Sequence, residues 1–499
     1  MTTSVKFGSF LAAADQASAA KVVVGAKGTI DLVKLSAVAA AAPFSALDAS
    51  VTAPLHLKEG GASSVTVWHK SGDSLQQIVF AEYTNELSRN MAVLRVDTLR
   101  DTVASAVPGT GNVQLTLVVA SAAEAYAAGL AAARNWPLYS SKTGKKAADR
   151  TVFVDFVVLN GEEVNAAEIQ AVADAIRNAQ RLVDTPPAEL NTDDMVAEAH
   201  RVAAHLNALK EGSVSVEVIR GEELRDRGFG GLWGVGKAAE FPPALVVLTH
   251  APASAESGKT VALVGKGIVY DCGGLSLKPT AGMCGMKSDM GGSAAVLGAF
   301  QAIVSSPVPS PNKVHALLCL AENAIDAKSY KNDDVLTLYS GKTVEITNTD
   351  AEGRLVLGDG VAYASKHLNP DVVIDIATLT GAQFIATGRV HAGVLTASED
   401  IESVILAAGK ATGDLTFPFV YARELLMKLF ESEVADMRNN VTVAMNASSA
   451  AAGHFVESHL AAEYKGKFLH IDIAGPSRAA KDRATGHGAA LLYEFVKTL

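Results

Sequence analysis

Cysteine is scarce in this chain: three residues in 499, all in the second half (Cys272, Cys284 and Cys319). So few cysteines cannot form the disulfide framework of a small secreted protein, and we interpret them as reduced thiols of an intracellular protein. No apolar run approaches the length of a membrane span. The N-terminus lacks a basic region followed by an apolar core, and the first arginine is Arg89, which disfavours secretory and transit peptides. We therefore expect a cytoplasmic protein with no membrane partner.

Positive charge is also in short supply, since the formal net charge is −10. This balance disfavours electrostatic binding to nucleic acid or to anionic membranes. The sequence contains neither His-Glu-x-x-His nor Gly-x-Ser-x-Gly, and the second absence disfavours a serine hydrolase. Residues 231–237 have the spacing of a phosphate-binding loop, but Ala238 replaces the required Ser or Thr, so we interpret them as a glycine-rich turn.

What the chain does contain is a pair of close carboxylates in the stretch Asn348-Thr349-Asp350-Ala351-Glu352-Gly353-Arg354-Leu355. In an extended backbone, Asp350 and Glu352 point to the same side. Gly353 allows a sharp turn, and Arg354 places a fixed cation beside the pair. Because neighbouring carboxylates repel each other unless something positive lies between them, this stretch indicates one metal ion or two.

A second stretch, residues 264–278, places ionisable groups in an apolar, glycine-rich run. Lys266 and Asp271 flank three apolar residues, Lys278 alternates with two leucines, and Asp289 precedes an expected helix at 293–303. Taken singly, each has an ordinary explanation as a turn or surface residue. Together the two stretches supply four carboxylates, which is enough for two ions. Oxygen-rich ligand sets suit Zn, Mn, Co or Mg.

These two stretches resemble the leucyl aminopeptidase (cytosol aminopeptidase) family of two-metal exopeptidases. Residues 348–355 match the family signature without a change, and Lys266, Asp271, Lys278 and Asp289 match its other motif. The resemblance continues through 375–381 and 470–475, and so covers roughly residues 165–499. The first 160 residues carry no motif that matches.

The resemblance implies a role for each matching residue. Asp271 and Glu352 bridge two divalent ions, Lys266 and Asp289 complete the tighter site, and Asp350 completes the more exchangeable one. The substrate's free amine and scissile carbonyl bind the metals, Lys278 stabilises the oxyanion, and Arg354 holds a bicarbonate that relays a proton. The implied substrate-binding residues are Met286, Asn348, Thr378, Leu379, Gly381 and Ala474. The implied substrates are peptides with a free N-terminus and an apolar first residue such as Leu, and the implied assembly is a homohexamer.

The pattern of apolar runs predicts an α/β protein. We expect an N-terminal α/β domain at 1–163, a connecting helix at 164–183 and a larger catalytic domain at 184–499 with a doubly wound, mostly parallel sheet. Expected N-terminal elements are strands at 65–68, 77–83, 113–120 and 152–159, and helices at 86–100 and 122–135. Expected catalytic strands are 214–219, 244–249, 261–264, 314–319, 372–376 and 468–471, and expected helices are 193–206, 293–303, 355–367, 423–433 and 450–463. Ligands should gather at the carboxyl ends of the strands.

Several positions depart from the family pattern: Cys272, the pair Cys284-Gly285, the pair Asn332-Asp333, and Ser477, where some relatives carry a larger pocket residue. None is an expected ligand, so they bear on pocket shape and preferred residue. Two alternative functions stay open. A non-catalytic scaffold on the same fold is disfavoured because unused buried carboxylates are destabilising. A DNA-binding role is disfavoured by the acidic balance.

Overall fold

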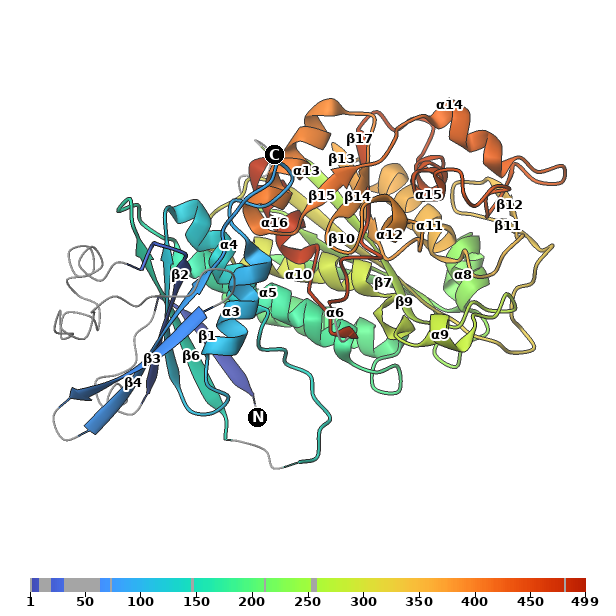
Figure 1. Cartoon of the computed structure of the whole chain (residues 1–499). Helices are drawn as coiled ribbons and strands as arrows, with labels where there is room; N and C mark the ends of the chain where they lie inside the picture. Colours follow the sequence, from blue (N-terminus) through green and yellow to red (C-terminus); the bar gives the residue numbers. More distant parts are fainter. Residues whose placement is uncertain are drawn as a thin grey trace. The chain divides into compact units, whose positions relative to one another are not determined.

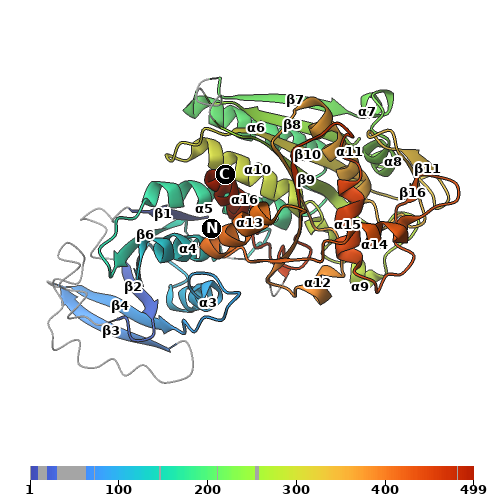
Figure 2. The same cartoon turned by 90° about the horizontal axis from the view of Figure 1, so that it is seen from above.

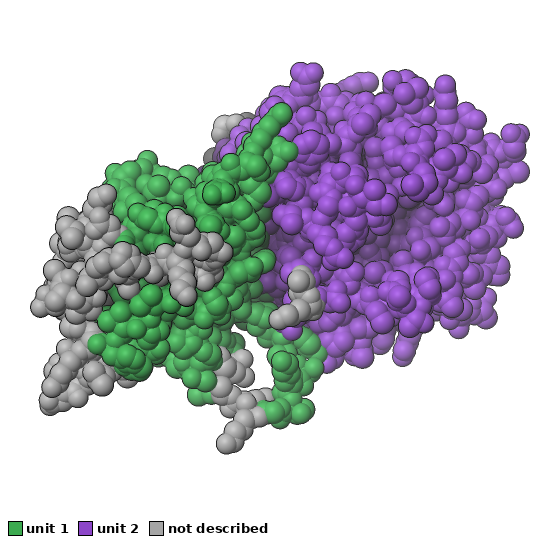
Figure 3. All heavy atoms as spheres, viewed as in Figure 1, with its two compact units in different colours: residues 1–177, 409–413 green, residues 178–408, 414–499 purple. Residues whose placement is uncertain are grey.

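A computed structural model describes residues 2–8, 19–30, 63–71, 74–144, 148–210, 212–252, 258–479 and 482–499. The chain divides into two compact units, coloured separately in Figure 3. One unit contains residues 1–177 and 409–413, and the other contains 178–408 and 414–499. The division falls within the helix α5 (Ala166–Asp184) and near the end of the helix α13 (Glu399–Thr412). No helix in the described part of the chain is both long and apolar enough to span a membrane.

The first unit is built on a six-stranded sheet with the order β1-β6-β5-β2-β4-β3. All neighbours are parallel except the hairpin of β3 and β4. Helices α3 and α4 belong to the same unit (Figure 1). The elements are β1 (Thr3–Phe7), β2 (Ala20–Ala26), β3 (Ser63–Ser71), β4 (Ser74–Tyr83), α3 (Val96–Ala106), β5 (Val113–Val119), α4 (Ala122–Ala133) and β6 (Arg150–Val158).

The helix expected at 86–100 is displaced, because α3 begins only at Val96. The residues before it form turns whose backbone groups bond elsewhere: Arg95 N donates to the Asn85 side chain, and Val93 N donates to Lys410 O. Asp97 then lies in the first turn of α3, where a carboxylate stabilises a helix. The apolar period alone did not locate this start. Strands β1 and β2 were not expected either.

The second unit contains an eight-stranded sheet with the order β15-β14-β17-β13-β9-β10-β8-β7. Its central strands β17, β13, β9 and β10 are mutually parallel. This confirms the expected α/β class with a larger, mostly parallel second sheet. The strands are β7 (Val214–Arg220), β8 (Ala244–His250), β9 (Thr260–Asp271), β10 (Lys313–Asn323), β13 (Val372–Ala377), β14 (Ala392–Leu395), β15 (Thr416–Pro418) and β17 (Lys467–Asp472). Strands β11 (Val335–Thr337), β12 (Thr343–Glu345) and β16 (Met437–Arg438) form a small separate sheet.

Helices cover both faces of the large sheet, with α6, α10 and α16 on one side and α8, α11 and α15 on the other (Figure 2). The central strands are therefore buried on both faces and are mostly apolar, with His315, Asp375 and His470 among their buried polar residues. The helices are α6 (Thr192–Leu209), α7 (Glu222–Asp226), α8 (Gly230–Gly236), α9 (Thr280–Met283), α10 (Gly291–Ser305), α11 (Gly353–His367), α12 (Gln383–Ala386), α14 (Arg423–Leu426), α15 (Ser448–Glu457) and α16 (Ala489–Thr498).

Three local expectations are corrected. The glycine-rich segment expected as a turn forms α8, and its glycines serve close packing: a Cβ on Gly230 would lie 1.9 Å from Thr337 O. The helix expected at 423–433 is only the short α14 followed by a 3-10 turn at Met427–Phe430. Strand β9 continues well past 264, because Gly265 lets α10 approach closely: a Cβ there would lie 2.6 Å from Ser293 Cα. Lys266 consequently lies within β9 and not after it.

Candidate metal centre

Three carboxylates meet where β9 and the loop before α11 end. Asp271 is the last residue of β9, and Asp350 and Glu352 lie in the turn that leads into α11. One oxygen from each lies within 4.8 Å of the others. The backbone here is a turn and not the extended segment expected, because Ala351 N bonds back to Asn348 O. The turn nevertheless brings both carboxylates to the same cluster.

A fourth carboxylate joins the cluster through a buried lysine. Lys266 Nζ lies 2.8 Å from Asp289 Oδ2 and 2.9 Å from Glu352 Oε1, and it donates to Thr378 O at 3.1 Å. Lys278 Nζ lies 2.8 Å from Asp271 Oδ2 and 2.6 Å from Asp350 Oδ1. Two lysines thus neutralise part of the charge of four closely placed carboxylates.

The second oxygens of Asp271 and Asp289 accept hydrogen bonds from donors outside the carboxylate cluster. Asp271 Oδ1 accepts from Gly273 N at 2.9 Å and from the Asn323 side chain at 2.8 Å. Asp289 Oδ1 accepts from Thr378 Oγ1 at 2.8 Å. In Asp271 and Asp289, one oxygen is therefore held in place by these donors while the other faces a lysine. Hydrogen bonds of this kind orient the carboxylates that bind a metal.

Burial makes the charged state of the cluster unfavourable unless cations are present. It raises the pKa of Glu352 to about 8, with a further contribution from Asp271. Burial also raises the pKa of Asp289 to about 6, although Lys266 opposes the shift. Burial alone lowers the pKa of Lys266, but Asp289, Glu352 and Asp271 outweigh it and raise that pKa above its usual value.

The arrangement fits divalent cations. Glu352 is 2% exposed, and among the residues that the structure describes its Oε2 has no hydrogen-bond partner. A buried, unpaired carboxylate oxygen is costly in a protein, and a bound metal ion removes that cost while the carboxylate stays ionised. Four carboxylates and one amine nitrogen form a donor set suited to Zn, Mn or Co. The set would suit Mg when fewer nitrogen atoms contact the ion.

The cluster opens into a cavity of about 180 Å³. It brings together the expected ligands, Lys278, and five of the six expected substrate-binding residues. Its walls are Lys266, Asp271, Lys278, Met286, Ser288, Asp289, Asp350, Glu352, Thr378, Leu379, Thr380, Gly381, Phe384, Ala474, Ser477 and Arg478. A cavity of this size suits one amino-acid residue better than a folded protein segment.

Asn348 and Arg354 do not line this cavity. The Asn348 side chain accepts from Asp350 N at 2.9 Å and so shapes the turn that carries the carboxylates. Arg354 is buried, donates through Nη1 to Asn439 O at 2.9 Å, and lies over the rings of Phe430 and Phe455. Burial lowers the pKa of its guanidinium to about 10, which still leaves it charged at neutral pH.

Three residues that matter here were given no role in the sequence-based prediction, although Asp472 lies within the matching stretch 470–475. Asn323 is the last residue of β10, and its side-chain amide donates hydrogen bonds to Asp271 Oδ1 and to Thr349 O. Asp472 ends β17 and accepts from Leu379 N and Ala474 N, each at 3.1 Å, and from Thr380 Oγ1. Arg478 follows in the next turn and lines the cavity. The signal available was that Asn323 and Asp472 are polar residues at the carboxyl ends of apolar strands.

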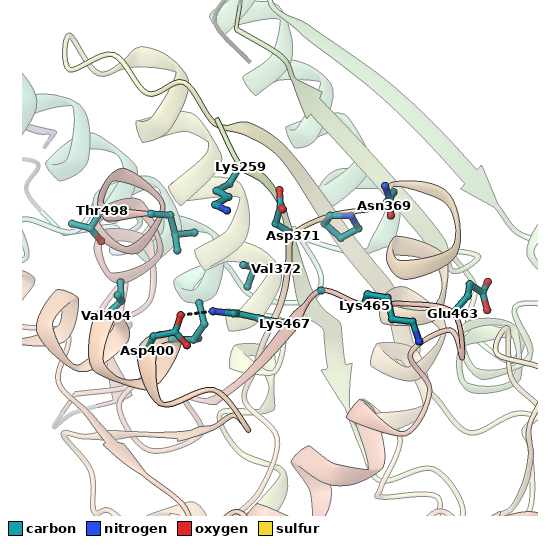
Figure 4. Close-up of a pocket in the computed structure, with 14 residues that line it drawn as sticks. Lys259, Asn369, Asp371, Val372, Asp400, Val404, Glu463, Lys465, Lys467 and Thr498 are labelled. Atoms are coloured by element: carbon teal, nitrogen blue, oxygen red, sulfur yellow. Dashed lines mark hydrogen bonds and ion pairs between the residues drawn. The ribbon is translucent and has the colours of Figure 1, made fainter. Parts of the chain in front are cut away.

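A larger hollow of about 610 Å³ lies at the opposite ends of the same strands. Figure 4 shows Asp371 and Val372 at the start of β13, and Lys467 at the start of β17 pointing toward Asp400. Its charged side chains are exposed, and none of the clustered carboxylates lines it. In open-sheet α/β proteins, ligands bind at the carboxyl ends of the strands, so the smaller cavity is the candidate site.

Comparisons with known proteins identify the family of the chain. The model of the cytosol aminopeptidase family, catalytic domain, matches residues 177–493. The chain is 47% identical to a mouse protein called probable aminopeptidase NPEPL1, over 77% of this chain and 72% of that protein. It is 44% identical to leucine aminopeptidase 1 of Caenorhabditis elegans, over 72% of this chain and 71% of that one. Leucyl aminopeptidase from Leishmania major, solved in complex with actinonin, superposes with a TM-score of 0.87 at 35% identity, covering 100% of this chain and 95% of that chain. The resemblance drawn from residues 264–289 and 348–355 is thereby confirmed, and the chain belongs to the cytosol aminopeptidase family.

Proposed function

We propose that this protein is a metal-dependent aminopeptidase that releases the first residue from peptides with a free N-terminus. The observation that carries the proposal is the set of four buried carboxylates and two lysines around one residue-sized cavity. We assign Asp271, Asp289, Asp350, Glu352 and Lys266 as ligands of two divalent ions. When bound, such ions polarise a carbonyl and lower the pKa of water to near neutral.

The chain's own residues position the substrate. Leu379 N and Thr380 Oγ1 both bond to Asp472, so the loop after β13 is fixed before a substrate arrives. This loop presents Thr378, Leu379 and Gly381 to the cavity, and Met286 and Ala474 form the wall for the first side chain. Lys278 lies at the cavity with an ammonium group that can stabilise the oxyanion of a tetrahedral intermediate.

Arg354 is the proposed anchor of a bicarbonate ion. Its Nε atom is buried and has no hydrogen-bond partner among the described residues, so the guanidinium retains a free donor. A bicarbonate accepted there would serve as the proton relay, and the neighbouring Asn439 carbonyl fixes the other arm of the guanidinium. Localisation in the cytoplasm is part of the same proposal.

Chelation is expected to abolish turnover of Leu-amide, and Mn, Co or Zn is expected to restore it. Without the ions, the carboxylates repel each other and no group in the site can polarise the substrate carbonyl as a metal ion does. The measurement is Leu-amide hydrolysis after exhaustive chelation, with metal content per chain determined in the same samples. Full activity in samples that contain no residual metal would overturn the proposal.

We also propose that the chain forms a homohexamer. Ile385, Val420 and Met445 are 82%, 68% and 88% exposed, and they line one apolar hollow of about 310 Å³. Exposed apolar patches of this kind mark interaction surfaces. Light scattering is expected to give a mass several times that of the 51.7 kDa chain. A monomer at working concentration would contradict the assembly and leave the proposed chemistry untouched.

A further inference from the structure

One cation in the cavity has no part in the proposed chemistry. Arg478 lines the cavity together with Ser477, and its side chain is 23% exposed. Within the described residues, the charged neighbour of its guanidinium is Asp482, whose Oδ1 lies 3.6 Å from Nη1. That separation is beyond hydrogen-bonding distance, and Asp482 is itself 82% exposed. The donors of Arg478 are therefore available to a ligand.

The backbone of the facing loop leaves space for this guanidinium. A Cβ at Gly285 would lie 1.8 Å from Arg478 Nη1, so the guanidinium lies directly against the glycine backbone. Gly285 has φ +89°, a conformation that glycine adopts without strain. The next residue, Met286, lines the cavity. Ser477 and Thr378 both lie beside Gly291. A Cβ added at Gly291 would be 3.8 Å from the Cβ of Ser477 and 3.3 Å from Thr378 Cγ2.

Met286, Ser477 and Arg478 thus form a wall that is partly polar and carries a positive charge. A purely aliphatic wall would suit only leucine-like side chains. We propose, resting on the aminopeptidase function above, that Arg478 is a specificity-determining residue that admits peptides whose first residue is acidic. The planar guanidinium would pair with the side-chain carboxylate of an N-terminal Glu or Asp.

The overall charge of the cavity favours the same class. With every group ionised, the four carboxylates and three cations that line it have a formal net charge of −1. Two divalent ions outweigh that charge and make the loaded cavity positive, even when Lys266 is the neutral ligand assigned above. An anionic side chain is then attracted, while an N-terminal Lys or Arg is repelled.

The test compares kcat/KM for Glu-amide and Gln-amide, which are nearly equal in shape and differ in charge. Amides are used because they carry no C-terminal carboxylate that could pair with Arg478 instead. In the metal-loaded wild type, Glu-amide is expected to exceed Gln-amide by about tenfold, a typical effect of one charge-assisted contact in a partly desolvated site. Arg478→Met is expected to abolish this ratio, Arg478→Lys to retain part of it, and Arg478→Glu to favour Lys-amide over Glu-amide.

Arg389→Met is the matched control. Arg389 is exposed and lies over the ring of Phe384, a residue that lines the cavity. Arg389 itself does not line the cavity, so its substitution removes a positive charge that is nearby but outside the site. Its Glu-to-Gln ratio is expected to equal that of the wild type. If the wild type hydrolyses Leu-amide but the ratio is the same in wild type and Arg478→Met, the inference is wrong and the aminopeptidase function stands. If the loaded wild type hydrolyses none of these amides, the proposed function fails first.

Discussion

Replacing Lys278 with alanine is expected to lower kcat for Leu-amide about 100- to 1,000-fold while changing KM little. An oxyanion donor acts mainly in the transition state, when negative charge develops on the carbonyl oxygen, so its loss appears in kcat. The Nζ atom is held 2.8 Å from Asp271 and 2.6 Å from Asp350, and the Lys278 side chain is 16% exposed. Lys278 therefore lines the cavity from a fixed position. The measurement is steady-state kinetics of the wild type and the variant at saturating Mn.

Two controls accompany this experiment. Because Lys278 also neutralises Asp271 and Asp350, the metal content of the variant must be determined in the same preparation. Lys287→Ala removes a nearby lysine whose Nζ bonds to Asp184 O, and its kcat is expected to stay within a few-fold of wild type. If Lys278→Ala raises KM and leaves kcat unchanged, Lys278 binds the ground state and is not the oxyanion donor.

Replacing Lys266 with arginine is expected to remove the tightly held ion and to abolish turnover. A lysine coordinates a metal only through its neutral amine, and neutralising it near pH 7.4 costs about 4 kcal/mol at its ordinary pKa. In the ion-free cluster, Asp289 and Glu352 raise that pKa further, so the metal must displace a proton. Arginine cannot supply a neutral nitrogen. If Lys266 were only a counter-charge, arginine would serve nearly as well.

The measurement is metal content per chain after dialysis, for wild type and Lys266→Arg. Packing needs its own control, because Gly353 accommodates the lysine closely: a Cβ there would lie 2.6 Å from Lys266 Cε. Thermal unfolding of both metal-free proteins supplies it, since equal stability shows that the arginine fits between Asp289 and Glu352. Two tightly held ions and normal turnover in the arginine variant would refute the ligand assignment.

The sequence predicted the central strands of the eight-stranded sheet well because they are covered on both faces. The segments 314–319 and 372–376 are apolar except for His315 and Asp375. The structure extends the first to Lys313–Asn323 and the second by one residue, to Ala377. Prediction was weaker where polar and apolar residues mix. The start of α3 depends on bonds to Asn85 and Lys410, which no local pattern reveals. The glycines of α8 look like turn residues until the elements packed against them are known.

In the candidate site too, the sequence predicted some residues and missed others. Lys266, Asp271 and Glu352 were singled out because charged groups stand out among apolar strands. Asn323 and Arg478 were missed, because their importance comes from contacts made across long stretches of chain. The net charge state of Lys266 likewise depends on Asp289 and Glu352 lying within 3 Å of its amine, whereas its own apolar surroundings suggest the opposite shift.

The central claim, an aminopeptidase that requires a free N-terminus, is tested most directly by one comparison. The Mn-loaded protein is given Leu-amide and acetyl-Leu-amide, and the release of ammonia is measured for each. Acetylation removes the amine that anchors the substrate at the metal centre and leaves the scissile bond unchanged. Rapid hydrolysis of Leu-amide with no detectable hydrolysis of acetyl-Leu-amide is the predicted result. Comparable rates on the two amides would contradict the account.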